Sequence, residues 1–173
     1  MANTDKCKAE KRWYRNTDVY SSDKTTLINV YNNYVGGGMG SVVFQTIRES
    51  KALAYSTYGY YMSPQKKDQD YYIMNYVGSQ ADKFNESTTA MNELLTTLPS
   101  LEGNLNLAKN QVRKDIQTER ITQVGIIFNY LGAKELGLND DIRKQVYTPV
   151  DNIKMGDVEK FHNQSFKSKP YTY

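Results

Sequence analysis

The chain has 173 residues and a formal net charge of +3, from 22 basic and 19 acidic residues that are well mixed along it. This length favours a single domain, and so balanced a charge argues against a nucleic-acid-binding surface. The single cysteine, Cys7, excludes a disulfide framework, and no apolar run forms a signal peptide or approaches the length of a transmembrane helix.

The first residues, MANTDKCKAEKRWYRN, are polar and contain no apolar core. They predict a polar leader over residues 1–24, ahead of a single α+β domain over residues 25–173. From Thr25 onward, apolar residues recur at helical spacing until the glycines at 36–38 end the predicted helix. A second short helix is predicted around residues 43–47.

Two tyrosine-rich segments flank the polar turn SPQKKDQ. They predict strands over residues 53–62 and 70–78, paired as an antiparallel hairpin. The chain after this hairpin has helical periodicity in three longer segments and two short ones. The apolar positions of the longer segments are Phe84, Met91, Leu94, Leu95 and Leu98; Leu105, Ala108, Val112 and Ile116; and Val124, Ile127, Phe128, Leu131 and Leu136. These elements predict an α+β fold in which helices cover one face of an antiparallel sheet.

The glycine-rich residues 36–41 are easily mistaken for a phosphate-binding loop. They match neither G-x-x-x-x-G-K-[ST] nor a strand-anchored G-x-G-x-x-G pattern. Because they follow a helix and not a strand, they predict a joint between two helices whose backbones approach closely.

The residue types in the chain argue against metal chemistry. A catalytic zinc site commonly uses three protein ligands, often histidines, whereas this chain has one histidine, His162, with Cys7 far from it in the sequence. His162 lies near a predicted helix end, where a surface or capping role is the ordinary explanation. We therefore expect no metal ligand and no catalytic residue in this chain.

Arg48 and Tyr55 have a plain explanation when they are considered alone. Arg48 would end a surface helix, and Tyr55 would be one of fifteen tyrosines, several of them in the same predicted strand. The sequence around them supports a second interpretation.

The segment NNYVGGGMGSVVFQTIRESKALAYS resembles the second-domain signature of the pitrilysin/insulinase family of zinc metallopeptidases. That signature is a helix ending in Gly-Gly, then small-Ser-x-φ-φ-x-x-φ-R-E-x-x-x-L-x-Y-S leading into a strand, where φ is apolar. The likeness continues more loosely, as a pattern of element lengths, over residues 25–170. The residues that match the signature are Gly40, Ser41, Val43, Phe44, Ile47, Arg48, Glu49, Leu53, Tyr55 and Ser56.

The resemblance implies a division of labour between two domains. A sister domain carries zinc on an inverted H-x-x-E-H motif, and the zinc-lacking domain closes over the peptide substrate. The arginine and tyrosine of the signature bind the substrate backbone, which assigns substrate binding here to Arg48 and Tyr55. A guanidinium and a phenol can both donate to a peptide carbonyl oxygen as it gains negative charge.

The same resemblance suggests the surroundings of the chain. The zinc-bearing domain would belong to the same parent chain or to a second subunit, and a bacterial periplasmic or an organellar setting suits the family. The family unit continues into a final strand where this chain stops at KPYTY. We therefore expect a unit truncated at its end, and one that could also lack its first strand. Its open sheet edge would lead either to self-association or to a disordered C-terminal tail.

Two further departures from the family matter for function. The chain has no H-x-x-E-H motif, which excludes zinc catalysis by this chain alone, and Ala52 stands where the family often has glycine. The main hypothesis is the zinc-lacking C-terminal domain of a zinc metalloendopeptidase. The alternatives are a non-proteolytic structural or assembly relative, like the core proteins of respiratory complexes, and, less strongly, an unrelated α+β binding module. The presence of both Arg48 and Tyr55 favours the first.

Overall fold

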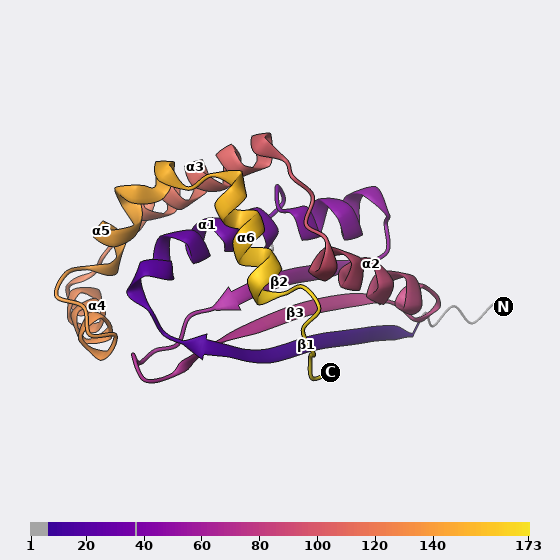
Figure 1. The fold of residues 1–173 in the computed structure, drawn as a ribbon, viewed down its shortest axis with the longest axis horizontal. Helices are drawn as coiled ribbons and strands as arrows, with labels where there is room; N and C mark the ends of the chain where they lie inside the picture. The colour runs from indigo at the N-terminus through magenta and orange to yellow at the C-terminus, as the bar shows by residue number, and fades with distance from the viewer. Residues whose placement is uncertain (1–6, 37) are drawn as a thin grey trace.

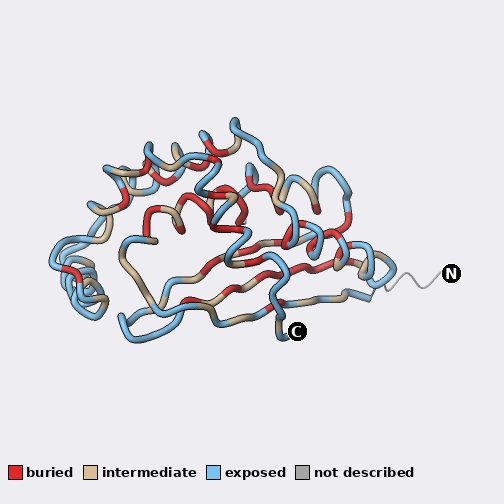
Figure 2. Tube along the Cα trace, in the orientation of Figure 1, coloured by how far each residue is buried: buried red, intermediate tan, exposed pale blue. Residues whose placement is uncertain are grey.

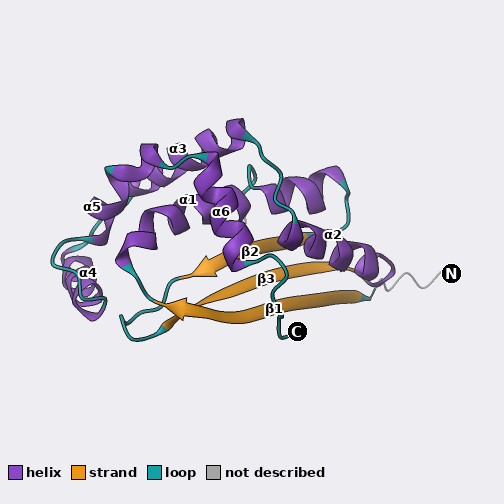
Figure 3. Ribbon diagram, in the orientation of Figure 1, coloured by secondary structure: helices purple, strands orange, loops and turns teal. Residues whose placement is uncertain are grey.

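The computed structural model describes residues 7–36 and 38–173, which form a three-stranded antiparallel sheet with helices on one side of it (Figure 1). β3 lies in the centre of the sheet, between β1 and β2. The α+β class and the helices on one face confirm the sequence prediction (Figure 3). In chain order the elements are β1 (Lys8–Val19), α1 (Thr25–Val35), a π-helical segment (Phe44–Ser50), β2 (Ser56–Met62), β3 (Asp70–Gln80), α2 (Phe84–Thr96), α3 (Glu102–Thr118), α4 (Gln123–Glu135), α5 (Ile142–Tyr147) and α6 (Met155–Ser165).

β1 corrects the prediction for the N-terminal segment. Residues 8–19 are an outer strand of the sheet, paired along β3, and not part of a polar leader. Residues 1–6 of the predicted leader lie outside the described residues. The folded domain therefore begins well before residue 25.

The anchor of β1 is Trp13, which is fully buried. Its Nε1 donates to Oδ1 of Asn92 in α2 at 2.9 Å. Its neighbours on the same strand face, Lys11 and Arg15, are only partly buried, because long side chains cover apolar surface with their stems and keep their charges near water. This is why a polar composition conceals a half-buried strand.

The predicted hairpin is confirmed, with small changes in its bounds. β2 and β3 pair antiparallel from Ser56 opposite Gly78 to Met62 opposite Tyr72. β3 continues to Gln80 because it also pairs with β1.

Both outer edges of the sheet are partly occupied. At β2, the Asn32 side chain of α1 accepts from the Tyr61 N–H at 2.8 Å and donates to the Tyr61 carbonyl oxygen at 2.9 Å. At β1, Tyr14 and Thr172 exchange two backbone hydrogen bonds of 2.9 Å, which form a single antiparallel bridge near the C-terminus. Self-association through an open edge stays a prediction, and these contacts leave fewer edge positions for it.

The core lies between the sheet and the helices. Side chains alternate across each strand, and buried residues run along the strands and along the helices above them (Figure 2). Many of the core residues are aromatic, so the high tyrosine content serves partly to fill this layer. The bulkiest fully buried side chains include Trp13, Tyr31, Tyr34, Tyr61, Tyr71 and Phe166.

His162 belongs to this core, so the expected surface or capping role is wrong. The side chain is 1% exposed because it shares the inward face of α6 with Phe161. Its ring stacks on Phe166 with centroids 5.1 Å apart, and its Nδ1 lies 2.7 Å from the hydroxyl oxygen of Tyr31 in α1. The imidazole therefore joins two helices inside the protein.

α4 is a helix as predicted, but its apolar side chains point to solvent. Val124, Ile127, Phe128 and Leu131 are each between 51% and 67% exposed. Helical periodicity thus identified the helix without showing that its apolar residues lie outside the core.

The role of β1 can be tested at two adjacent residues. Trp13→Ala is expected to lower the free energy of unfolding by about 3–5 kcal/mol, because it removes a buried indole and leaves a cavity. Tyr14→Ala is the matched control, since Tyr14 lies on the opposite strand face and is 40% exposed; it should cost much less. Urea denaturation followed by circular dichroism measures both, and equal effects would contradict the assignment of β1 to the folded domain.

The buried histidine predicts a dependence of stability on pH. Burial lowers the pKa of His162 to about 4, against the opposing effect of the Leu94 and Leu95 carbonyls. The unfolded chain binds this proton near pH 6.5, so stability is complete above that pH and is lost as pH falls toward 4. The free energy of unfolding should be about 2 kcal/mol lower at pH 5 than at pH 7.

The control for this measurement is His162→Phe, which keeps an aromatic ring against Phe166. His162 is the only histidine of the chain, so the variant should lose most of the difference between pH 7 and pH 5 even if its stability is lower at both. A variant with the full pH dependence would show that other groups cause it.

Candidate functional site

The segment between α1 and β2 contains both residues that the sequence analysis assigned to substrate binding. It begins at Gly36, where a side chain would overlap the Asn32 carbonyl oxygen and lie 2.7 Å from Cε1 of Tyr60. The hydroxyl of Ser41 donates to the Gly36 carbonyl oxygen at 2.9 Å and holds the turn. The glycines thus join α1 to the next helical segment as predicted, with Gly37 outside the described residues. The close approach at Gly36 is to α1 itself and to Tyr60 of β2, whereas Gly38 and Gly40 have open space around them, so the predicted close packing of two helix backbones is not found there.

The π-helical segment then presents Arg48 at the surface. The Lys51 N–H donates to the Thr46 carbonyl oxygen, five residues earlier, at 3.2 Å, and Ile47 is fully buried and anchors the segment. Short π-helical stretches occur frequently at functional sites. The buried Ile47 thus holds the backbone in place, and the Arg48 side chain next to it stays in solvent.

Within the part of the chain that the structure describes, the guanidinium of Arg48 has surface contacts alone. Its carbon lies 4.8 Å from the ring centroid of Phe44, and its Nε lies 3.8 Å from a carboxylate oxygen of Glu49. The side chain is 47% exposed, and exposed ion pairs contribute little stability. Most of its donors therefore remain free for a ligand.

Tyr55 is held by its backbone and has a free hydroxyl. Its N–H donates to the Gly78 carbonyl oxygen of β3 at 3.1 Å. The side chain is 41% exposed, and the ammonium of Lys8 lies 5.8 Å from the ring centroid. Among the described residues, no hydrogen bond involves the phenol oxygen, so this group can bind a ligand.

Arg48 and Tyr55 are therefore both exposed donors on the short connection from the π-helical segment into β2. Among the described residues, no hydrogen bond, ion pair or ring contact joins the two side chains. Each of them projects from a backbone that is held by its own contacts, Arg48 beside the buried Ile47 and Tyr55 through its bond to Gly78.

The turn between them has an unusual backbone conformation at Ala52. Its φ is +48°, in the left-handed region that disfavours residues with a Cβ. The Ala52 carbonyl oxygen accepts from Nζ of Lys83 at 3.0 Å. Position 52, where the pitrilysin/insulinase family often has glycine, is thus a position whose backbone conformation glycine would adopt more easily.

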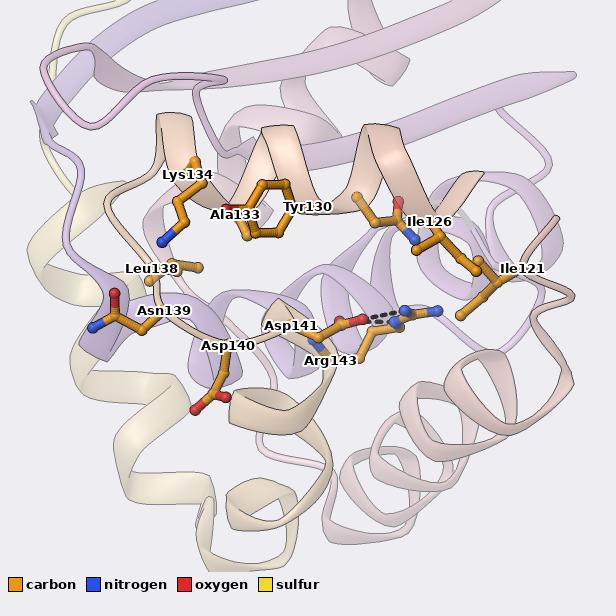
Figure 4. Close-up of a pocket in the computed structure, with 11 residues that line it drawn as sticks. Ile121, Ile126, Tyr130, Ala133, Lys134, Leu138, Asn139, Asp140, Asp141 and Arg143 are labelled. Carbon is orange, nitrogen blue, oxygen red and sulfur yellow. Dashed lines mark hydrogen bonds and ion pairs between the residues drawn. The ribbon is translucent and has the colours of Figure 1, made fainter. Parts of the chain in front are cut away.

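A separate cavity also contains a guanidinium and a phenol, those of Arg143 and Tyr130. It has a volume of about 310 Å³ and lies between α4 and the loop before α5 (Figure 4). Arg143 donates to Asp141 at 2.8 Å and to Glu119 at 3.2 Å, and this contact lowers the pKa of the Asp141 carboxyl. The charges of Arg143 and Asp141 in this cavity therefore balance each other. Neither Arg48 nor Tyr55 lines the cavity.

Residues 7–36 and 38–173 contain neither a metal-binding cluster nor a membrane-spanning helix. No group of three or more His, Cys, Asp and Glu side chains there could hold a metal ion. No helix in the same ranges is both long enough and apolar enough to cross a bilayer.

One feature of the site escaped the sequence analysis. Tyr76 folds over Gly78, so that a Cβ on Gly78 would lie 2.6 Å from the Tyr76 hydroxyl and 3.1 Å from Cε2 of Tyr55. A glycine inside a strand often marks such a close approach, and that signal was present in the sequence at Gly78.

The comparisons with known proteins identify the family of the domain. A family model described as the peptidase M16 inactive domain matches residues 13–132. YmxG of Bacillus subtilis, an uncharacterized zinc protease, is 38% identical over 69 residues, which are 40% of this chain and only 16% of that protein.

Solved structures share the fold. A putative zinc protease from Bordetella pertussis superposes with a TM-score of 0.75 at 14% identity, over 99% of this chain and 94% of that chain. Complex III2 from Candida albicans contains a similar domain, with a TM-score of 0.61 at 18% identity, over 91% of this chain and 40% of that chain.

The strained turn gives a prediction about stability. Ala52→Gly should raise the free energy of unfolding by roughly 0.5–1 kcal/mol, because relief of the left-handed strain outweighs the entropy that glycine loses on folding. Ala54→Gly is the control, since it adds the same entropy cost nearby without a positive φ to relieve, and it should destabilise. Thermal melting of both variants measures the difference; a destabilised Ala52→Gly protein would contradict the assigned backbone conformation.

Proposed function

The chain belongs to the family of the peptidase M16 inactive domain, and on that premise we propose that it closes over a peptide that a zinc-bearing partner domain hydrolyses. The partner would lie on the same parent chain or on a second subunit. This chain aligns with 16% of the length of its curated relative, so the activity of the whole protein is part of the proposal.

The residues of this chain do not suit zinc binding. His162 is buried with its Nδ1 against Tyr31, and Cys7 is exposed beside the start of β1. We therefore assign the zinc to the partner domain, where it would activate the attacking water. The contribution of this chain is to bind and orient the peptide.

Arg48 and Tyr55 would bind the peptide backbone. The observation that carries this role is that both are exposed donors, one with surface contacts only and the other with an unpaired hydroxyl among the described residues. Each could donate to the carbonyl oxygen of the scissile peptide, and such bonds strengthen as that oxygen gains charge in the transition state. Their backbone anchors, the π-helical segment and the bond to Gly78, limit the reorganisation that binding requires.

A second candidate function has one observation in its favour. The likeness to a domain of a respiratory complex suits a structural or assembly role without proteolysis. At 18% sequence identity, this similarity shows a shared fold and not a shared function. A purely structural role also gives no reason for two exposed hydrogen-bond donors, Arg48 and Tyr55, beside the strained Ala52. Peptide turnover separates the two functions.

The proposal predicts a loss of activity without a loss of fold. In the enzyme assembled with its zinc-bearing partner, Arg48→Ala or Tyr55→Phe should lower turnover by roughly 10²–10³-fold, the usual effect of removing one oxyanion donor. The melting temperature should barely change, since exposed substitutions usually stay within about 0.5 kcal/mol. Peptide hydrolysis and melting are measured on the same preparations.

Matched controls are available in exposed positions away from the site. Arg120→Ala removes a guanidinium from the loop before α4, and Tyr130→Phe removes a phenol hydroxyl from α4 itself. Both should keep normal turnover. A folded Arg48→Ala, Tyr55→Phe double variant with normal turnover would leave only the structural role.

A further inference from the structure

The face of the sheet turned away from the helices carries a set of tyrosines that the proposed reaction does not use. Tyr61 points to the helices, because it is fully buried and packs against Phe161 of α6. Tyr58 and Tyr60 have the opposite parity on β2, and Tyr76 lies opposite Tyr58 on β3. These three side chains therefore belong to the uncovered face, below the sheet in Figure 3.

The tyrosines of this face form a connected row with Tyr55. Tyr55 and Tyr76 meet over Gly78, where a Cβ would come within 3.1 Å of the first ring and 2.6 Å of the second hydroxyl. Tyr76 stacks on Tyr58 with centroids 4.9 Å apart, and Tyr58 lies 5.7 Å from Tyr60. We call Tyr55, Tyr76, Tyr58 and Tyr60 the tyrosine row.

The row has a buried centre and accessible sides. Tyr76 is 8% exposed beneath its neighbours, whereas Tyr55 is 41% exposed, and Tyr58 and Tyr60 are partly exposed. Tyr60 lies at the outer edge of β2, where its ring reaches the turn at Gly36. The row thus runs from the start of β2 to the glycine joint.

The spacing of the row suits an extended peptide. Alternate residues of an extended chain lie about 6.6–6.8 Å apart on the same side, close to the 5.7 Å between the Tyr58 and Tyr60 rings. A peptide that follows β2 from Tyr55 would therefore present every second side chain to the row. A single small aromatic molecule would use only part of it.

The charges beside the row favour an aromatic side chain over a basic one. Arg12 lies 5.3 Å from the Tyr76 centroid and Lys8 lies 5.8 Å from the Tyr55 centroid. These cations already occupy the positions that a peptide arginine or lysine would take over the two rings. Arg12 is itself paired with Glu10, whose carboxylate oxygen lies 3.1 Å from its guanidinium. Uncharged rings can still stack on, or meet edge-on, the open parts of Tyr58 and Tyr60.

We propose that the tyrosine row is a subsite that binds aromatic side chains at alternate positions of an extended peptide. The inference rests on the proposed function, because the peptide is positioned by its contact with Tyr55. It adds a preference of substrate class to a site whose two donors recognise only the backbone.

The test compares two labelled peptides that differ only at two alternate positions, one with phenylalanine and one with leucine. Their affinities for the 173-residue chain are measured by fluorescence anisotropy. Two aromatic contacts should make the phenylalanine peptide bind about tenfold more tightly. Equal affinities would overturn the subsite, because leucine matches the apolar burial but cannot stack.

Variants separate the subsite from the backbone contacts. The double variant Tyr58→Thr, Tyr60→Thr keeps β-forming residues and should abolish the preference for phenylalanine. Tyr72→Thr, on the same sheet face but outside the row, should retain it, and melting verifies that each variant is folded. A double variant that keeps the preference would overturn the proposal.

The proposed function has its own readout in the same assay. Arg48→Ala should weaken both peptides equally and leave their ratio unchanged. Peptide binding that is insensitive to Arg48 would count against the backbone role alone, whereas failure of both peptides to bind the unaltered chain would overturn the subsite and the backbone role together.

Discussion

The structure depends on a single constraint, the alternation of side chains across a sheet that has helices on only one side. Along β1 and β2 every second residue faces the helices, and Trp13 and Tyr61 are fully buried in the core. The residues between them must then lie on the uncovered face. The same strands therefore build the core and display the surface on which the proposed site lies, and a shift by one residue would exchange the two.

The connection between α1 and β2 combines three backbone features in a short stretch. The turn at Gly36 leaves no space for a Cβ atom. The segment Phe44–Ser50 is π-helical, and Ala52 has a φ in the left-handed region. Local strain of this kind persists where the surrounding structure fixes the backbone, and it is concentrated at functional sites. Here Ile47 and Leu53 supply that support from the core, and Arg48 and Tyr55 are the side chains that remain outside.

The role that we propose for this chain is to bind a peptide. The only histidine of the chain is committed to an aromatic core between α1 and α6, and the carboxylates beside the cavity near α4 face Arg143. The groups that stay available are a guanidinium, a phenol and a row of aromatic rings. Such groups hold an extended peptide and stabilise charge that develops on it, as a domain that closes over a partner's active site requires.

The sequence by itself determined the fold class, the hairpin, the helices and the segment that carries Arg48 and Tyr55. Each of these is a local pattern: a period of two or 3.6, a glycine turn, or a short signature of residue types. It did not reveal β1, because the strand lies at the sheet edge and Lys11 and Arg15 cover the core with their stems. It also misplaced His162, since one residue on an amphipathic helix can face either side until its neighbours are known.

Only the tertiary structure decided which surfaces are covered. α4 has an apolar sequence and lies exposed, whereas the polar-looking strand around Trp13 lies against the core. The tyrosine row likewise joins residues 55, 58, 60 and 76 through strand pairing and the bare backbone of Gly78. Burial and proximity of this kind depend on contacts between segments that are distant in the sequence, and no periodicity within one segment can report them.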